Sequence, residues 1–171
     1  MKIKYHSLGS LWRYFLHRMV SEKGDVDYIA RGWALGMFIG CLIPMGLQLV
    51  IAVPLSCPLK SSKIGAVFGT FLTNPLTVWF IYPAQCWLGE RLLGEGHNLD
   101  TIRTLLKDVI QEQSFAALRA LSGQLLLAFF VGGLLLALIL TPLTYYLVRL
   151  GVLRYRKVRE KLRQHRLMRR A

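Results

Sequence analysis

Three long stretches without a charged residue constrain this chain more than any other feature of its sequence. They run from 32 to 59, from 64 to 89 and from 120 to 148. Each exceeds the roughly 20 residues with which an α-helix crosses about 30 Å of hydrocarbon. Together they hold nearly half of the 171 residues, which leaves too little polar sequence to cover them as a buried core. We therefore expect an all-α integral membrane protein.

The first two runs are interrupted by proline and glycine. Pro44 and Gly46 lie near the middle of the first run, and Pro75 and Pro83 interrupt the second. Proline inside a helix removes a backbone hydrogen bond and clashes with the preceding turn, at a cost of about 3 kcal/mol or more. Irregular backbone at membrane depth is tolerated only where protein or trapped water satisfies it. We therefore expect Gly/Pro-broken or re-entrant membrane helices, with breaks at these four residues.

Glycines recur at four-residue spacing at the start of both runs. On a helix this spacing forms one smooth face, which lets a second helix backbone approach closely in lipid. The residues expected to pack helices in this way are Gly32, Gly36, Gly40, Gly65 and Gly69.

Polar segments flank the helical membrane domain, which we place at residues 28–148. Residues 1–27 carry an apolar stripe opposed by cations, a pattern typical of an amphipathic helix lying in the membrane interface. The alternative is that this stripe packs onto the rest of the protein. Residues 90–119 hold four basic and five acidic residues and a second amphipathic helix. Residues 149–171 form a basic tail with ten Lys or Arg.

The basic tail supplies most of the net charge of +13. A basic run attracts phosphate of any origin. Beside a membrane segment, however, such residues more often fix the topology and contact anionic lipid head groups. We therefore expect anionic lipid as the partner of the tail, and we rank nucleic acid last.

The charge distribution also predicts a topology. Both ends of the chain are basic, so both are expected in the cytoplasm under the positive-inside rule. Three simple crossings would separate the ends, so one run must enter the membrane and return. The first run is the best candidate, because each arm beside its break is only about 18 Å long. Its exit loop, with Lys60 and Lys63, then lies with the basic ends. In a rival arrangement all three runs are re-entrant or doubled, with Gly132 and Gly133 turning the third.

An Asn-Pro pair in the second run suggests a binding site. Asn is a favoured N-cap and Pro a favoured first helical residue, so the pair is typical of one half-helix ending and another beginning. Such a break exposes a helix N-terminus near membrane depth. Breaks in two successive runs are typical of discontinuous transporter helices, whose binding sites lie at the breaks. The candidate binding residues are Gln48, Thr70, Thr73, Asn74 and Thr77.

The alternative interpretation of these polar residues is structural. Asn74 could serve only to satisfy carbonyls freed by Pro75, and Gln48 only to bridge two helices. Such hydrogen bonds contribute about 0.6 to 2 kcal/mol in membranes. The sequence leaves the two interpretations open.

No catalytic or metal-binding constellation is present in the sequence. There are no paired carboxylates, no Ser/His/Asp set, no phosphate-cradling loop and no metal-ligand spacing. Cys41, Cys57 and Cys86 all lie in apolar runs, where cysteine is expected as a small buried hydrophobe. Glu90, at the edge of the second run, is interpreted as a head-group anchor. We therefore expect no enzyme activity, no metal and no cofactor.

Several motifs resemble one bacterial membrane family, catalogued as domain of unknown function 2062. They are ALGMFIGCLIPMGLQ, the short basic loop after it, and GTFLTNPLTVWFIYP followed by LGERLLG. The resemblance covers roughly residues 28–94, with TNPLT at 73–77 as its most specific part. It departs at Ser61 and Ser62, where relatives often carry an Asn. It implies a small helical domain of the bacterial cytoplasmic membrane, sometimes fused to enzymes such as glycosyltransferases, with no established activity.

Two functions are consistent with these features. The first is a translocation module for a small polar solute or a lipid head group, favoured by the broken helices. The second is a membrane-embedded scaffold or anchor for partner proteins, favoured by the small size and by the fusions of relatives. We expect a homo-oligomer or a partner membrane protein, and for translocation the reason is that three runs are few to enclose a path.

Overall fold

The structure is a computed structural model, and the ranges that it describes contain helices and no strand. The expected all-α class is therefore confirmed for this part of the chain. The predicted N-terminal amphipathic helix lies outside the described residues, as do the breaks at Pro44, Gly46 and Pro75. The described residues are 24–43, 47–71, 77–94, 96–112, 121 and 123–169, without the side chains of 108, 163 and 166.

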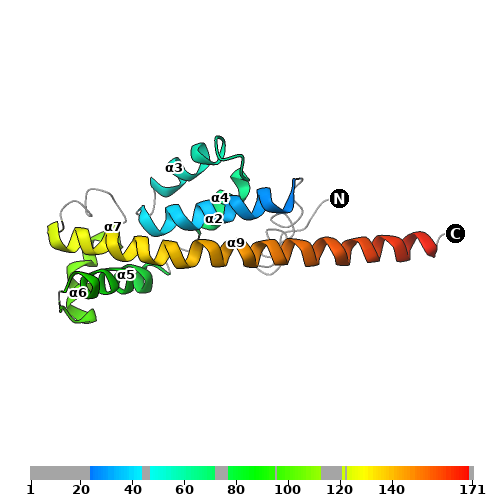
Figure 1. The fold of residues 1–171 in the computed structure, drawn as a ribbon. Helices are drawn as coiled ribbons and strands as arrows, with labels where there is room; N and C mark the ends of the chain where they lie inside the picture. The colour runs from blue at the N-terminus through cyan, green and yellow to red at the C-terminus, as the bar shows by residue number, and fades with distance from the viewer. Residues whose placement is uncertain are drawn as a thin grey trace.

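The helices are arranged along one long rod, α9, which is 46 residues long (Figure 1). In Figure 1, α5, α6 and α7 lie at one end of α9, α2 to α4 lie along its middle, and its C-terminal part projects beyond the other helices. The helices are α2 (Val26–Leu42), α3 (Leu47–Ser56), α4 (Lys63–Thr70), α5 (Val78–Leu93), α6 (Leu99–Leu105), α7 (Lys107–Glu112) and α9 (Gly123–Met168).

The residues that follow α3 lie close to the start of α2. Asp25 caps α2, because its side chain accepts a hydrogen bond from the backbone N–H of Val26. After α3, the backbone N–H of Ser62 donates to the carbonyl of Tyr28 at 3.1 Å. The loop between α3 and α4, which carries Lys60 and leads into Lys63, therefore lies beside the first turn of α2. The described ends of the first run, the start of α2 and the end of α3, therefore lie near each other.

From that loop, α4 runs along α2 in the same direction, and glycines bring the two backbones together. A Cβ atom on Gly36 would lie 2.1 Å from the carbonyl oxygen of Ala66, and one on Gly69 would lie 2.2 Å from that of Trp33. Both distances exclude any side chain at these positions. Of the five glycines expected to pack helices, Gly32, Gly36, Gly65 and Gly69 lie in this contact, and Gly40 is buried in α2.

Glycines also join α9 to α5 and α2, both of which run antiparallel to it. A Cβ atom on Gly89 would lie 1.8 Å from the carbonyl oxygen of Ala128, and one on Gly132 would lie 1.8 Å from that of Gln85. Gly133 faces the carbonyl oxygen of Cys41, the next to last residue of α2. The rival arrangement, in which the Gly-Gly pair turns the third run, is therefore wrong. The pair lets helices pack against α9, which continues without a turn.

The predicted helix break at Pro83 is also wrong. Pro83 is buried inside α5, which continues from Val78 to Leu93. Proline removes a single backbone hydrogen bond here, and the packing of α5 against α9 on both sides of it offsets that cost. Pro54 in α3 and Pro142 in α9 likewise lie inside helices.

The acidic segment after α5 folds back onto it and forms a core with the start of α9. The second amphipathic helix expected there is divided into α6 and α7, whose buried apolar residues face α5. The aromatic rings of Tyr82 and Phe129 meet edge to face, 5.1 Å apart. The buried members of this core are Val78, Tyr82, Cys86, Ile102, Leu106, Val109, Ile110, Leu125 and Phe129.

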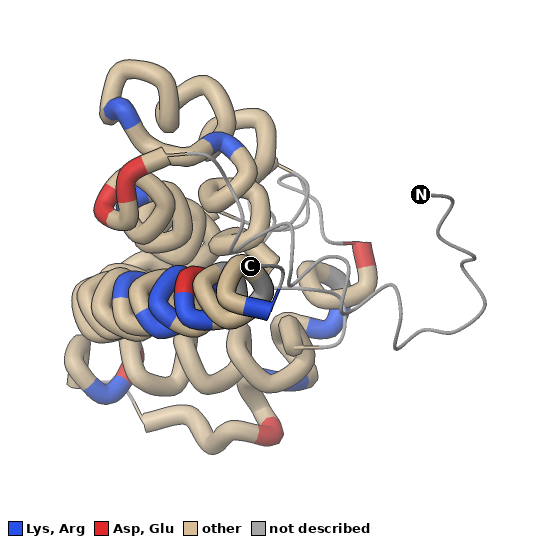
Figure 2. The backbone as a smooth tube through the Cα atoms, turned by 90° about the vertical axis from the view of Figure 1, so that its right-hand side faces the viewer, with Lys and Arg blue, Asp and Glu red and all other residues tan. Residues whose placement is uncertain are grey.

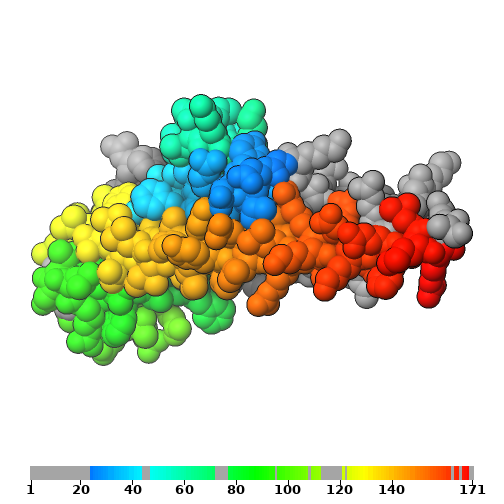
Figure 3. Space-filling view, turned by 45° about the vertical axis from the view of Figure 1, so that its right-hand side comes forward, coloured from blue at the N-terminus to red at the C-terminus, as the bar shows by residue number. Residues whose placement is uncertain are grey.

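The basic tail is the projecting part of α9. No helix end separates it from the third apolar run, since α9 continues to Met168. Lys and Arg gather on this end of α9, as Figure 2 shows. Figure 3 shows the same end extending past the body formed by the other helices. The lysines and arginines are therefore presented on a helical rod.

Candidate functional site

Two candidate binding residues from different apolar runs meet in the interior. Gln48 on α3 is 4% exposed, and Thr70 on α4 is 1% exposed. The side-chain Nε2 of Gln48 donates to the backbone carbonyl of Thr70 at 3.4 Å. The Thr70 hydroxyl donates to the carbonyl of Val67 at 2.7 Å. The structure thus places a buried polar pair where α3 begins and α4 ends.

This pair adjoins both predicted breaks. Gln48 follows the break at 44–46, and Thr70 precedes the Asn-Pro break. Thr77 comes directly before α5, and its carbonyl accepts hydrogen bonds from the N–H groups of Phe80 and Ile81. The two other candidates, Thr73 and Asn74, lie outside the described residues. Of the five candidates, the structure therefore brings Gln48 and Thr70 together.

The depth of the pair follows from its neighbours on α2. The backbone nitrogen of Thr70 lies 2.8 Å from the position that a Cβ atom on Gly36 would take. Gly36 is ten residues into α2, or roughly 15 Å from its start. The pair therefore lies well inside the helical body, away from the charged end described next.

The first turn of α2 is tied to α9 by a carboxylate. Asp27 Oδ1 accepts a hydrogen bond from the Tyr145 hydroxyl at 2.8 Å and one from Arg149 Nε at 2.9 Å. These donors, the hydroxyl foremost, hold the pKa of Asp27 below its ordinary value of 3.8 against the opposing effect of desolvation. Arg156 donates to the carbonyl of Gly24 at 2.6 Å. The beginning of the described chain and the basic part of α9 therefore share one end of the molecule.

A buried acid lies at the opposite end, and sequence reasoning assigned it wrongly. Glu90 is 2% exposed, so it is not a head-group anchor. Its Oε1 lies 3.0 Å from Nδ1 of His97. The sequence contained a pattern that predicts this burial, because four residues follow one another at four-residue spacing, namely Val78, Tyr82, Cys86 and Glu90. A helix places all four on one face, so the buried stripe of α5 extends to Glu90.

Gln85 is a second buried polar residue that sequence reasoning missed. It is fully buried, and its Nε2 donates to the carbonyl of Phe129 at 2.8 Å. Its Oε1 has no hydrogen-bond partner among the described residues. This side chain therefore ties α5 to α9 beside the glycines of their contact.

Residues 10–161 match the model of a family described as an uncharacterized protein conserved in bacteria, DUF2062. The chain belongs to this bacterial family. The match extends well beyond residues 28–94, which carried the resemblance, and it includes α9 as far as its projecting part. No curated protein and no solved structure matches the chain significantly.

One helix of this DUF2062 chain is long and apolar enough to cross a membrane, among the residues that the structure describes. It is the part of α9 from Gly123 to Leu162. Of the 18 consecutive residues with the highest mean hydropathy in this part of α9, 33% are buried, whereas the core helix of a soluble protein is mostly buried. The chain thus belongs to a bacterial family, and one of its described helices is capable of spanning a membrane.

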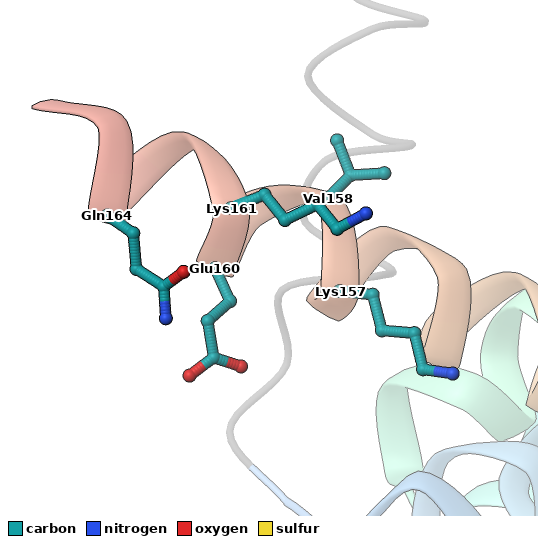
Figure 4. A pocket seen from close by; sticks show the side chains of 5 residues that line it. All are labelled: Lys157, Val158, Glu160, Lys161 and Gln164. Carbon is teal, nitrogen blue, oxygen red and sulfur yellow. The ribbon is translucent and has the colours of Figure 1, made fainter.

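The described ranges hold no metal-binding cluster, and the pocket found on α9 is an open surface hollow. No group of three or more His, Cys, Asp or Glu residues there could hold a metal ion. A hollow of about 310 Å³ lies on the projecting part of α9, and Figure 4 shows the side chains that line it. A single helix supplies all of the described residues that line it, so in this part of the chain it is a surface hollow between side chains. They are Lys157, Val158, Glu160, Lys161 and Gln164.

Proposed function

We propose that this protein is a multi-pass module of the bacterial cytoplasmic membrane, with two crossings, a re-entrant hairpin and both termini in the cytoplasm. The unbroken crossing is α9 between Gly123 and Val148. Several large apolar side chains on this stretch are exposed. A continuous apolar surface of this kind is rare in soluble monomers and suits contact with lipid. The exposed residues are Leu127, Leu134, Leu138, Ile139, Leu143 and Leu147.

The second crossing is broken and consists of α4 and α5. α4 begins beside the first turn of α2, and α5 ends beside the start of α9. Their 8 and 16 residues give about 36 Å of helix, enough for the hydrocarbon core. The hairpin of α2 and α3 starts and ends on the side of the basic tail, in keeping with re-entry without crossing.

Within this module we propose that Gln48 and Thr70 form part of a path for a small polar solute or a lipid head group. The observation that carries the proposal is their buried contact between the start of α3 and the end of α4, roughly 15 Å from the charged end. Buried polar groups at broken helices near the bilayer midplane are typical of transporter binding sites. The exposed apolar side chains of α3, Val50 among them, suit contact with a second copy or a partner membrane protein.

Purified protein in vesicles tests this function with defined probes. Vesicles carrying a fluorescently labelled phosphatidylglycerol in both leaflets are treated with dithionite, which bleaches only the outer leaflet. Translocation of the head group raises the bleached fraction from half to nearly all. Glycerol entry, followed by light scattering, tests a small polar solute. Protein-free vesicles and the Gln48→Met variant are the controls. Wild-type results equal to those of empty vesicles with both probes contradict the proposal.

The projecting helix favours a second candidate function, a membrane anchor or scaffold. The 20 residues from Arg149 to Met168 extend about 30 Å beyond the last uncharged turn of α9. A basic rod of this length can hold anionic lipid and present a surface to partner proteins. Removing residues 150–171 separates the two functions. Translocation survives the truncation if the path lies in the helical body, whereas partner recruitment and lipid binding are lost.

A further inference from the structure

The most unusual group outside the proposed path is the buried carboxylate of Glu90. It is 2% exposed, and its Oε2 has no hydrogen-bond partner among the described residues. Burying an ionised carboxylate without full hydrogen bonding is expensive, and uptake of a proton removes that cost. A buried polar atom without a hydrogen-bond partner requires an explanation, and the residue in contact with the same carboxylate is the first to consider.

That partner is His97, and the backbone brings it into place. α5 ends at Gly94, which has a φ of +81° and donates its N–H to the carbonyl of Glu90. A left-handed residue of this kind reverses the chain, and glycine adopts it without strain. The reversal returns His97 over the helix end, with Nδ1 3.0 Å from Glu90 Oε1. The imidazole side chain is 49% exposed, so it contacts both the buried acid and solvent.

Among the residues that the structure describes, the other groups on the elements around Glu90 are uncharged or exposed. On α5, Cys86 is buried one turn earlier and its thiol donates to the carbonyl of Leu125 at 3.7 Å. Arg91 is exposed and lies over the ring of Trp87. α9 carries no charge from Gly123 to Val148. On α6 and α7, the acids and bases whose side chains are described are exposed, namely Asp100, Arg103, Lys107 and Glu112.

We infer that Glu90 and His97 form a proton-binding site, in which His97 passes protons between solvent and the buried carboxylate. In uptake, Nε2 of the neutral imidazole accepts a proton from a hydronium ion, and the proton on Nδ1 moves to Glu90 Oε1. The carboxylate becomes a carboxylic acid, water is released, and the ring ends as its other neutral tautomer. Histidine suits this transfer, because its ordinary charge change falls between about pH 5 and 8. The inference does not rest on the proposed function.

Infrared difference spectroscopy of the full-length protein tests the site. Spectra are recorded as the pH of a supported protein film is cycled between about 8 and 5. The wild type should show a carboxylic acid C=O band that is lost in Glu90→Gln and kept in Asp100→Asn, which changes an exposed acid. In His97→Gln the band should remain, but its appearance after the pH change should be slower by about 100-fold. Circular dichroism verifies that each variant is folded.

Two outcomes overturn the inference. If Glu90→Gln gives the wild-type difference spectrum, Glu90 binds no proton in this range. If the band forms at the wild-type rate in His97→Gln, His97 is no part of the route. Should Glu90→Gln fail to fold, Glu90→Asp provides the same assignment, because the shorter side chain shifts the band in frequency without removing it. An unshifted band in that variant also contradicts the site.

Discussion

Asp27 and Arg149 form an ion pair of 2.9 Å between residues 122 positions apart in the sequence. The pair fastens the first turn of α2 to α9 where its uncharged stretch ends. Tyr145 donates to the same carboxylate oxygen from one turn earlier on α9. The contact therefore marks the position along α9 at which α2 begins, from which the depth of the Gln48–Thr70 pair is counted.

Acid should weaken the tie between Asp27 and Arg149, because the pKa of Asp27 is lowered in the folded protein. The folded protein holds this proton less readily than the unfolded chain, whose ordinary pKa is 3.8. The tie therefore contributes stability above that value, and the contribution is lost as pH falls through the lower folded pKa. Thermal unfolding between about pH 6 and 3 should show a steeper loss for wild type than for Asp27→Asn. Asp100→Asn, at a fully exposed acid, should follow the wild type, and parallel curves for all three exclude this role.

The glycine contacts of α9 should resist substitution. A methyl group on Gly132 would overlap the carbonyl of Gln85. Gly132→Ala should therefore destabilise the fold by about 1 to 3 kcal/mol through overpacking. Gly151→Ala is the matched control, since nothing lies within 4 Å of its Cβ position on the same helix. That variant should gain up to about 1 kcal/mol from helix propensity. Unfolding in mixed detergent measures both, and equal effects contradict this packing.

Substitution of Gln48 distinguishes a structural role of this residue from a role in translocation. In Gln48→Met the hydrogen bond to Thr70 is lost while side-chain length is kept, which should lower stability by about 0.6 to 2 kcal/mol. If Gln48 also lines the proposed path, the same variant should lose translocation while remaining folded. Thermal stability in detergent and vesicle flux are measured on the same preparations. A flux that merely follows the folded fraction assigns Gln48 a structural role alone.

Asn74 offers a related test beside the predicted second break. As a helix cap only, Asn74→Ser should preserve stability, whereas Asn74→Ala should cost about 0.5 to 2 kcal/mol. A substrate contact predicts lost activity in Asn74→Ser, because a hydroxyl cannot offer the amide's separate donor and acceptor. Stability in detergent and flux in vesicles are compared across both variants. Activity that tracks stability in both removes Asn74 from the binding site.

The proposed topology predicts which positions are reached from outside the cell. In a variant without the native cysteines, single cysteines replace Lys60, Asp100 or Arg159. An impermeant maleimide added to intact cells should label the Asp100 position and leave the other two unlabelled until the cells are opened. The opposite pattern reverses the orientation. Labelling of all three, with intact cells verified by a cytoplasmic control protein, contradicts the two-crossing arrangement.

The basic tail should bind anionic membranes through charge. A peptide of residues 149–171 should bind vesicles with anionic lipid, with about 1 kcal/mol from each basic residue near the surface. Added salt should weaken this binding, because the charges lie in water. The matched peptide with glutamine at the ten basic positions should not bind. Equal binding to neutral vesicles would exclude an electrostatic mechanism.

Local patterns in the sequence were enough for the helical class and for part of the packing. Four-residue spacing alone indicated the glycines that bring α2 and α4 together, because a helix places such residues on one face, but it did not indicate those that bring α9 to α5 and α2. The same rule applied to α5 would have placed Glu90 in its buried stripe. The expected breaks at Pro83 and at the Gly-Gly pair were wrong, because the effect of proline or glycine depends on what packs against it.

The sequence by itself determined helical segments, their apolar faces and the charge at each end, since these follow from the side chains of neighbouring residues. Only the tertiary structure decided that Gln48 meets Thr70, that Asp27 meets Arg149 and that His97 returns to Glu90. Each of these contacts requires two helices, or a helix and its following loop, to meet at one position along their lengths. That position is set by the close approach of backbones at glycines and by the reversal of the chain at Gly94. Neither feature can be read from the sequence spacing of the residues that finally touch.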